Sequence, residues 1–208
     1  MRRIVLATRN AKKITELEHI LQAAGLTDVE LVGPELYASL PDIPETGLTF
    51  AENSLIKARA VAAATNLPAI ADDSGLCVDA LNGMPGVLSA RWSGRFGDLP
   101  TGPGRDLSNL HLVLDQLGDV PDEHLAANFT CAAALALPDG TEHVVDGIMP
   151  GHLIRTPRGA NGFGYDPIFV PEGHTRTAAE LTPDEKNAIS HRGRAFRALV
   201  PLLKQIAD

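Results

Sequence analysis

Residues 3–24, RIVLATRNAKKITELEHILQAA, hold the two patterns that decide the fold class. Residues 3–8 form a nearly continuous apolar run, which is typical of a strand in the centre of an α/β sheet. From Asn10 to about Ala24 the apolar side chains recur at helical spacing, and Gly25 then provides a stop signal. A buried strand that leads straight into an amphipathic helix predicts an α/β fold.

The middle of the chain continues this alternation of helices and strands. The capping box TFAE (49–52) predicts a helix that runs to about Ala64. Residues 67–71 predict a short strand that ends at the sequence DDSG (72–75). Residues 79–105 show no sustained period, which predicts a long loop.

The second half of the chain adds helices and a hairpin. Asp106 is expected to cap a helix, and residues 128–137 and 141–148 predict a hairpin because Pro-Asp-Gly joins them. A glycine-rich loop at 159–164 leads to a short strand at 168–170.

The C-terminal region predicts two successive helices. A second capping box, TPDE (182–185), starts the first, and a break near Ser190 separates it from the last. Pro201 lies inside that last helix, and we expect it to kink or shorten the helix.

Composition narrows the functional classes. The 208 residues fit one domain, 1–208, or two small lobes that share a core. The 26 acidic and 18 basic residues give a net charge of −8, which speaks against a nucleic-acid-coating surface or a polybasic membrane anchor. Two cysteines and a short apolar N-terminal run predict a reduced, soluble protein of the cytoplasm without a signal peptide or membrane span.

Three segments of the first half carry candidate site residues. Residues 8–13 (TRNAKK) lie between the first strand and helix, where backbone N–H groups and two lysines favour a polyphosphate; solvated surface lysines are the alternative. In DDSG (72–75) adjacent acids on extended chain point to opposite sides, so one can bind Mg²⁺ while the other makes structural hydrogen bonds; a capped turn is the alternative. Glu45 and Lys57 flank the start of the second helix and are either part of this site or plain surface.

Two segments of the second half carry the remaining candidates. In GFGYDP (162–167) the glycines allow close backbone approach, Phe163 can stack on a planar ligand and Asp166 can accept from a base edge; a tight turn with a core Phe is the alternative. Lys186 can meet a phosphate and Arg192 can donate to a carbonyl oxygen; an ordinary surface pair of His191 and Arg192 is the alternative.

Five segments together resemble the inosine/xanthosine triphosphate pyrophosphatase family. They run nearly end to end: ATRNAKKITEL (7–17), ETGLTFAENSLIKARA (45–60), AIADDSGLCVDALNGMPGVLSARWSG (69–94), GANGFGYDPIFVP (159–171) and TAAELTPDEKNAISHRGRA (177–195). The resemblance implies an α/β fold with a long twisted mixed sheet, flanking helices and two lobes around a central nucleotide-binding cleft, usually in a homodimer. It also implies Mg²⁺-dependent hydrolysis of ITP, dITP and XTP to the monophosphate and pyrophosphate.

The resemblance also assigns roles by position. Asp73 would hold the metal and activate water, and Glu45 would help to bind the metal, although Pro44 precedes it where many members have a second acid. The substrate would contact Thr8, Arg9, Asn10, Ala11, Lys12, Lys13, Lys57, Ser74, Phe163, Gly164, Tyr165, Asp166, Lys186, His191 and Arg192. Residues 95–105 match no family segment and receive no function.

Two rival functions remain open at this point. A Maf-like nucleotide pyrophosphatase would act on pyrimidine or modified nucleotides. A non-catalytic nucleotide-binding regulator would keep the cleft without the reaction. Binding to DNA or RNA is disfavoured by the charge and by the lack of a basic stripe.

Overall fold

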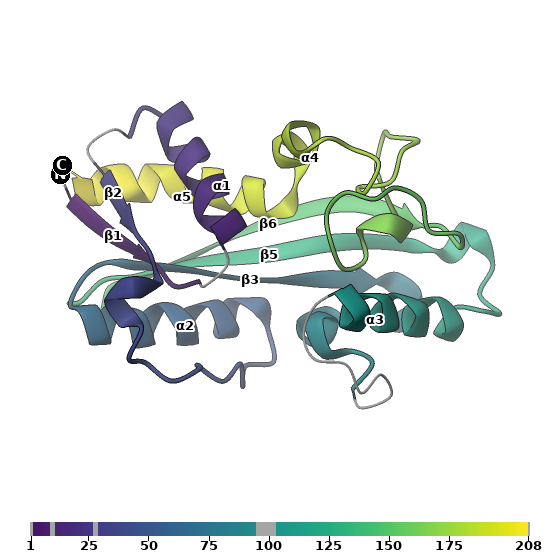
Figure 1. The fold of residues 1–208 in the computed structure, drawn as a ribbon, viewed down its shortest axis with the longest axis horizontal. Helices are drawn as coiled ribbons and strands as arrows, with labels where there is room; N and C mark the ends of the chain where they lie inside the picture. The colour runs from purple at the N-terminus through teal and green to yellow at the C-terminus, as the bar shows by residue number, and fades with distance from the viewer. Residues whose placement is uncertain (1, 9–10, 27–28, 95–102, 208) are drawn as a thin grey trace. The chain divides into compact units, whose positions relative to one another are not determined.

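The computed structural model describes residues 2–8, 11–26, 29–94 and 103–207 (Figure 1). The chain divides into two compact units. Unit 1 comprises residues 1–73, 131–147 and 191–208, and unit 2 comprises residues 74–130 and 148–190. Within the described residues, no helix has the length and apolar character needed to cross a membrane.

A mixed sheet with flanking helices confirms the expected α/β class. Hydrogen-bonded neighbours follow the order β2-β1-β3-β5-β6-β7, and β4 pairs with β3. The pairs β1–β2 and β1–β3 are parallel, whereas β3–β4 and β6–β7 are antiparallel. The strands are β1 (Arg2–Leu6), β2 (Val29–Val32), β3 (Ala69–Val78), β4 (Met84–Pro85), β5 (Ala126–Ala136), β6 (Glu142–Leu153) and β7 (Phe169–Pro171).

Unit 1 places helices on both faces of its strands. Helices α1 (Ala11–Ala23) and α5 (His191–Ala207) pack through Leu17 and Phe196 into a cluster that includes Ile70. Helix α2 (Phe50–Thr65) packs through Val61 into another cluster that includes Ala71. Because successive residues of a strand point to opposite faces, Ile70 and Ala71 show that α2 covers the face opposite to α1 and α5 (Figure 1).

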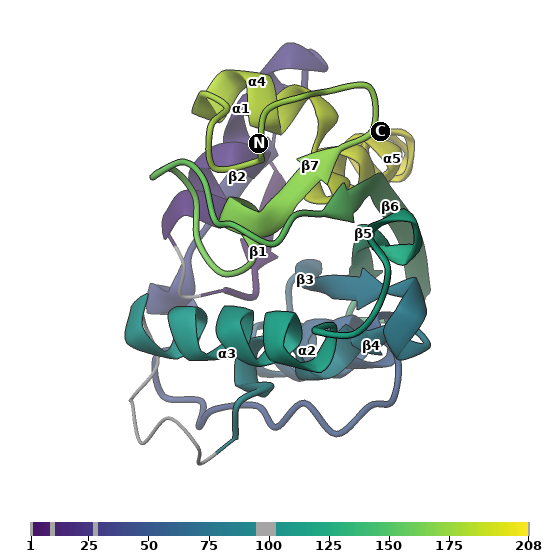
Figure 2. The ribbon, with the colours of Figure 1, turned by 90° about the vertical axis from the view of Figure 1, so that its right-hand side faces the viewer.

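Unit 2 has its own core. Helix α3 (Pro103–Gln116), labelled in Figure 2, contributes Leu110 and Val113 to a cluster with Leu76 of β3 and Phe169 of β7. The rings of Phe129 and Phe169 meet edge to face with centroids 4.7 Å apart. The remaining elements are helix α4 (Pro183–Ile189) and the 3₁₀ turns Asp79–Leu81, Gly86–Arg91, Asp122–His124 and Asp166–Ile168; a further 3₁₀ turn, Pro34–Tyr37, belongs to unit 1.

Several predicted elements are confirmed. Helix α2 begins at the expected capping box, in which Thr49 and Glu52 exchange hydrogen bonds. The hairpin of β5 and β6 turns at Gly140, whose φ of 90° is one that L side chains rarely adopt. The break between α4 and α5 falls at Ser190, as expected.

The predicted end of the strand over residues 67–71, which corresponds to β3, is wrong. We expected the strand to end at Ala71, but β3 continues to Val78, so DDSG lies inside the strand. The polar run resembles a turn, yet the structure buries both aspartates, Asp72 beside Lys13 and Arg192 and Asp73 beside Asn53 and Lys57. Strand β1 instead ends at Leu6, which pairs with Ile70, so the aspartates lie just beyond the carboxyl end of β1.

Other differences have simple physical reasons. Strand β2 was not predicted, because four residues are too few to show alternation. Helix α3 begins at Pro103 and not at Asp106, and a proline in the first helical position was the available signal. Residues 79–91, expected as loop, form short 3₁₀ turns and the two-residue β4. Pro201 does not end α5, which continues to Ala207.

Candidate active site

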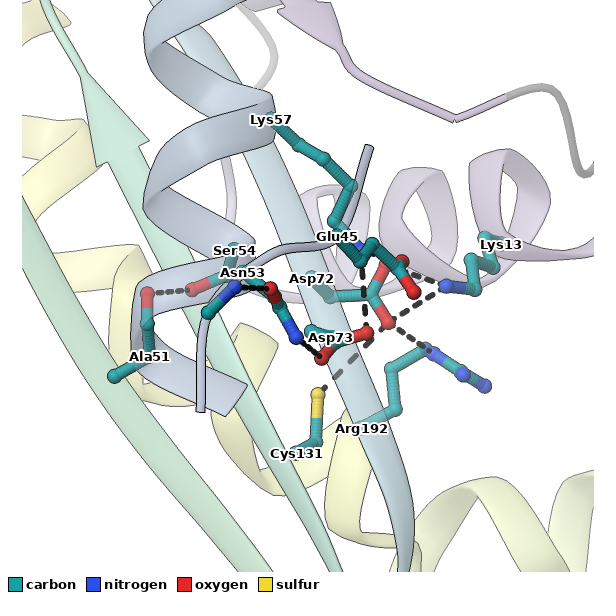
Figure 3. Close-up of polar contacts among 11 residues, drawn as sticks. Lys13, Glu45, Ala51, Asn53, Ser54, Lys57, Asp72, Asp73, Cys131 and Arg192 are labelled. Atoms are coloured by element: carbon teal, nitrogen blue, oxygen red, sulfur yellow. Dashed lines mark hydrogen bonds and ion pairs between the residues drawn. The ribbon is translucent and has the colours of Figure 1, made fainter. Parts of the chain in front are cut away.

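The two adjacent aspartates of β3 point to opposite faces of the strand, as the sequence predicted for an extended chain. Asp72 contacts Lys13 of α1 and Arg192 of α5, whereas Asp73 contacts residues of α2 (Figure 3). The amide of Ala7 donates to the carbonyl of Ile70 over 2.7 Å, which anchors β3 just before the pair. One dipeptide therefore supplies a carboxylate to each of two distinct polar clusters.

The first cluster surrounds Asp72. The Lys13 Nζ lies 2.9 Å from each carboxylate oxygen, and the Arg192 Nε donates to Oδ2 over 3.1 Å. The Asp72 side chain is only 1% exposed. Burial alone would raise its pKa, but the charges of Lys13 and Arg192 hold the pKa of Asp72 far below its ordinary value.

Lys13 lies at a helix position where a positive charge is unfavourable. It lies in the first turn of α1, which has no acidic residue there, so its charge opposes the helix dipole. A bound polyphosphate, which the sequence of residues 8–13 favours, would compensate this charge. In the structure Asp72 already does so, and the Lys13 side chain remains 19% exposed.

Arg192 reaches Asp72 because α5 starts close to the sheet. A Cβ at Gly147 of β6 would lie 2.1 Å from the His191 carbonyl oxygen and 2.5 Å from the Ala195 nitrogen. Only glycine permits this approach of strand and helix. His191 and Arg192 are consequently both buried at the first turn of α5.

The second cluster surrounds Asp73. The Asn53 Nδ2 donates to Oδ2 over 3.1 Å, and the Lys57 Nζ lies 3.2 Å from Oδ1. The same Lys57 nitrogen lies 2.9 Å from Glu45 Oε1, so one ammonium bridges two carboxylates. Lys57 and Glu45, which the sequence left as either site or surface, thus belong to one cluster with Asp73.

Asn53, which lies in the same stretch of sequence as Glu45 and Lys57 but was predicted no role, is also a member of this cluster. Besides its bond to Asp73, its Oδ1 accepts from the Gly47 amide over 2.8 Å, which ties the loop before α2 to the strand. The available signal was spacing, because Asn53 and Lys57 stand four residues apart and share one face of the helix.

The pKa values of Asp73 and Lys57 both lie above their ordinary values. Burial raises the pKa of Asp73, the Lys57 charge offsets part of that shift, and the Glu45 charge adds to it. For Lys57, burial acts to lower the pKa, but the charges of Asp73 and Glu45 raise it above its ordinary value. The raised pKa makes the Asp73 carboxylate a stronger proton acceptor than an ordinary aspartate.

The two clusters differ in charge. In the part of the chain that the structure describes, the Asp72 carboxylate contacts the cations of Lys13 and Arg192, whereas the Lys57 ammonium contacts the carboxylates of Glu45 and Asp73. The excess of positive charge around Asp72 suits a phosphate, and the excess of negative charge around Lys57 suits a divalent cation. Within the described residues no three His, Cys, Asp or Glu side chains gather as metal ligands. The pair Glu45 and Asp73 still fits Mg²⁺, which is commonly held by one or two carboxylates plus substrate phosphates.

Unit 2 holds a separate cluster in the loop GFGYDP. Asp166 Oδ2 accepts from the Phe163 amide over 2.9 Å and from the Lys186 Nζ over 2.5 Å. The Lys186 Nζ lies 5.5 Å from the centroid of the Phe163 ring, which is 54% exposed. A Cβ at Gly162 would lie 2.1 Å from Asp166 Oδ2, so the loop needs glycine there. The loop therefore presents an aromatic face, as its sequence indicated.

Tyr165 and Gly164 are held by contacts within unit 2. Tyr165 is buried and its hydroxyl donates to the Ser89 carbonyl over 2.8 Å. Burial, with the Asp106 charge, raises the pKa of Tyr165 above its ordinary value. The Gly164 amide donates to Asp106 Oδ2 over 3.2 Å. Asp106, which the sequence assigned to a helix cap, thus supports the loop instead.

The other predicted residues are placed as follows. Thr8 is half-buried, and its carbonyl accepts from the Tyr37 hydroxyl over 3.0 Å. Ser74 follows Asp73 in β3 and is half-buried. Ala11 and Lys12 begin α1, and the predicted contacts of Arg9 and Asn10 lie outside the described residues.

Comparisons with known proteins agree over nearly the whole chain. A protein from Streptomyces coelicolor named dITP/XTP pyrophosphatase is 62% identical over 99% of both chains. A crystal structure of a nucleoside-triphosphatase, dITP/XTP pyrophosphatase, from Mycobacterium abscessus is 54% identical and covers 97% of this chain and 99% of its own, with a TM-score of 0.76. The structure of a HAM1 protein from Coxiella burnetii is 43% identical, covers 99% and 100% of the two chains and has a TM-score of 0.87. The Ham1 family model matches residues 4–202, and the chain belongs to the Ham1 family.

Proposed function

We propose that this protein hydrolyses the non-canonical purine nucleoside triphosphates dITP, ITP and XTP to the monophosphate and pyrophosphate. The observation that carries the proposal is the divided aspartate pair, with Asp72 among cations and Asp73 beside Glu45 and Lys57. The names of the relatives, dITP/XTP pyrophosphatases, support the substrate class.

Lys13 and Lys57 are proposed to hold the triphosphate. Each ammonium carries three N–H donors, and Asp72 accepts from Lys13 with its two oxygens, so a phosphate oxygen can use a donor that Asp72 does not take. Lys57 is held by Glu45 and Asp73 and supplies a second positive charge. Backbone N–H groups at the start of α1 favour the same anion.

Asp73 is proposed to be the general base. Its raised pKa lets it take a proton from water, and Asn53 and Lys57 fix its two oxygens in place. The activated water would attack the α-phosphorus, and the bond to the bridging oxygen of the β-phosphate would break.

Glu45 and Asp73 are proposed to hold Mg²⁺ together with phosphate oxygens of the substrate. When bound, this ion would neutralise the negative charge that develops on the departing pyrophosphate. Lys57 lies between the two carboxylates and keeps them near each other.

Discrimination against adenine is proposed to rest on the atom at position 6 of the purine. Hypoxanthine and xanthine present a carbonyl there, whereas adenine presents an amino group. Arg192 is proposed to donate to that carbonyl, and an adenine would leave the donor unsatisfied, which costs a few kcal/mol. Phe163, with Lys186 over its ring, supplies an aromatic surface on which a base can stack.

We further propose a cytoplasmic homodimer that does not bind nucleic acid. The net charge of −8 supports the last point, and Cys77 and Cys131, which form no disulfide in the structure, are compatible with a reducing compartment. Light scattering after size exclusion tests the dimer, and a mobility-shift assay with duplex DNA at low salt tests nucleic-acid binding.

A substrate panel tests the proposed activity. With Mg²⁺, pyrophosphate release from ITP, dITP and XTP should be much faster than from ATP or GTP, and EDTA should abolish it. Faster release from dTTP, UTP or methylated pyrimidine nucleotides would favour the Maf-like alternative. Binding of ITP without any pyrophosphate would favour a non-catalytic regulator and would contradict the proposal.

A further inference from the structure

We infer that Asp72 is a positioning residue, because one buried carboxylate sets the places of both Lys13 and Arg192. The inference rests on the proposed function, in which Lys13 binds the triphosphate and Arg192 reads the purine. The proposed reaction itself uses Asp73, and Asp72 has no part in its chemistry.

Substrate has little access to Asp72. The side chain is 1% exposed, and its oxygens accept from Lys13 and Arg192, with the Cys131 Sγ 3.9 Å from Oδ2 (Figure 3). A carboxylate enclosed in this way acts on a ligand only through the groups that it holds. The Lys13 and Arg192 side chains remain 19% and 11% exposed, respectively.

Asp72 is also the contact that brings two like charges together. Lys13 Nζ and Arg192 Nε both bond to the same oxygen, Oδ2, at 2.9 Å and 3.1 Å. Lys13 comes from the start of α1 and Arg192 from the start of α5. Without the negative charge between them, these two cations would repel each other and lose their shared acceptor.

The contacts of Asp72 fix the position of each cation. Lys13 contacts both oxygens of Asp72, which restricts a long and otherwise flexible side chain to one place. Arg192 is held through Nε, which fixes the plane of its guanidinium. A change at Asp72 should therefore disturb phosphate affinity and base choice at the same time.

The test is Asp72→Asn, which keeps the side-chain size but removes the charge and one acceptor. We expect the KM for ITP and the dissociation constant for inorganic triphosphate, measured calorimetrically, to rise about 10- to 100-fold, the range for losing hydrogen bonds to a charged group. The kcat should change much less. The ratio of kcat/KM for ITP over ATP should fall, which a merely structural role would not cause. Asp115→Asn, at an exposed position on α3, is the matched control.

A double-mutant cycle separates positioning from general destabilisation. Lys13→Met should weaken triphosphate binding strongly in the wild-type background and only slightly in the Asp72→Asn background. If Asp72→Asn does not fold, Asp72→Glu keeps the charge and displaces it by one methylene, and it should raise KM while leaving kcat near the wild-type value.

The outcomes separate this inference from the proposed function. If wild-type protein releases no pyrophosphate, the proposed function fails, while Asp72-dependent binding of inorganic triphosphate would still support the positioning role. An unchanged triphosphate affinity and KM in folded Asp72→Asn, or fully additive effects in the cycle, would overturn the inference.

Discussion

At the scale of single residues, burial gives the two aspartates of β3 opposite properties. Both are largely buried, and burial raises the pKa of any carboxyl group. For Asp72 two cations reverse this effect, whereas for Asp73 the single Lys57 is shared with Glu45 and burial prevails. One carboxylate thus stays charged and structural, and the other is suited to exchange a proton.

This difference predicts the effect of Asp73→Asn. An amide cannot accept the proton from water, so kcat for ITP should fall by about 10²-fold or more, the usual contribution of a general base. Because the substitution removes a largely buried charge whose pKa burial raises, thermal unfolding should occur at or above the wild-type temperature.

Pyrophosphate release and circular dichroism of the same preparation measure both effects. Asp119→Asn, at an exposed position, provides the control and should behave as wild type. Folded Asp73→Asn protein with full turnover would remove Asp73 from the mechanism.

At the scale of elements, α2 places Asn53 and Lys57, and its N-terminal cap fixes where the helix begins. The Glu52 amide donates to Thr49 Oγ1 over 3.1 Å, and Glu52 Oε2 accepts from the amides of Leu48 and Thr49. Thr49→Ala removes the first of these bonds and should lower the free energy of unfolding by about 1 kcal/mol. Urea denaturation measures this loss, and Thr49→Ser, which keeps the hydroxyl, should restore most of it.

The capping box of α4 depends on pH through Glu185. Its bonds with Arg176 and with the amide and hydroxyl of Thr182 lower the pKa of Glu185 from 4.5 to about 2. A carboxyl group whose pKa is lower in the folded state stabilises the fold above its unfolded pKa. That stabilisation is lost as the pH falls through the folded pKa.

The variant Glu185→Gln tests this dependence. At pH 6 wild type should be more stable than Glu185→Gln, and the difference should vanish between pH 4.5 and pH 2. Chemical denaturation of both proteins at several pH values measures it. A difference that stays constant across that window would mean that the Glu185 charge does not stabilise α4.

Helix starts and turns were predicted best where residues close in sequence make the hydrogen bonds that define them. Capping boxes start α2 and α4, and the Pro-Asp-Gly turn joins β5 to β6, because side chains within four residues satisfy the backbone. The sequence could not predict that β3 continues through DDSG, because cations distant in sequence, such as Arg192, make a buried aspartate tolerable there. Likewise Asp106 contacts Gly164, 58 residues away, which no local pattern indicates.

At the scale of the whole molecule, net charge and local charge give different information. The chain carries a charge of −8, yet two cations face one acid around Asp72. The total charge argues against a polyanionic partner such as DNA, whose many phosphates meet a broad surface. A triphosphate instead requires only a few fixed cations, so the acidic surplus does not oppose the proposed substrate.

The connection between the two units predicts how the protein unfolds. Strands β3, β5 and β6 each contain residues of both units, since the unit boundaries at 73/74, 130/131 and 147/148 fall inside them. If one unit unfolded alone, each of these strands would have to fray in its middle. We therefore expect a single cooperative transition, as for a small one-domain protein.

Two local probes can measure this cooperativity. Trp92, the single tryptophan, reports on unit 2, where its Nε1 donates to Gln116 Oε1 over 2.9 Å. The buried thiol of Cys131 reports on unit 1 once Cys77 has been replaced by serine. In urea, the midpoint of the Trp92 fluorescence change should coincide with the midpoint for Cys131 labelling by a thiol reagent. Labelling of Cys131 at clearly lower urea, with Trp92 fluorescence still native, would show instead that unit 1 unfolds first and that the shared strands do not couple the units.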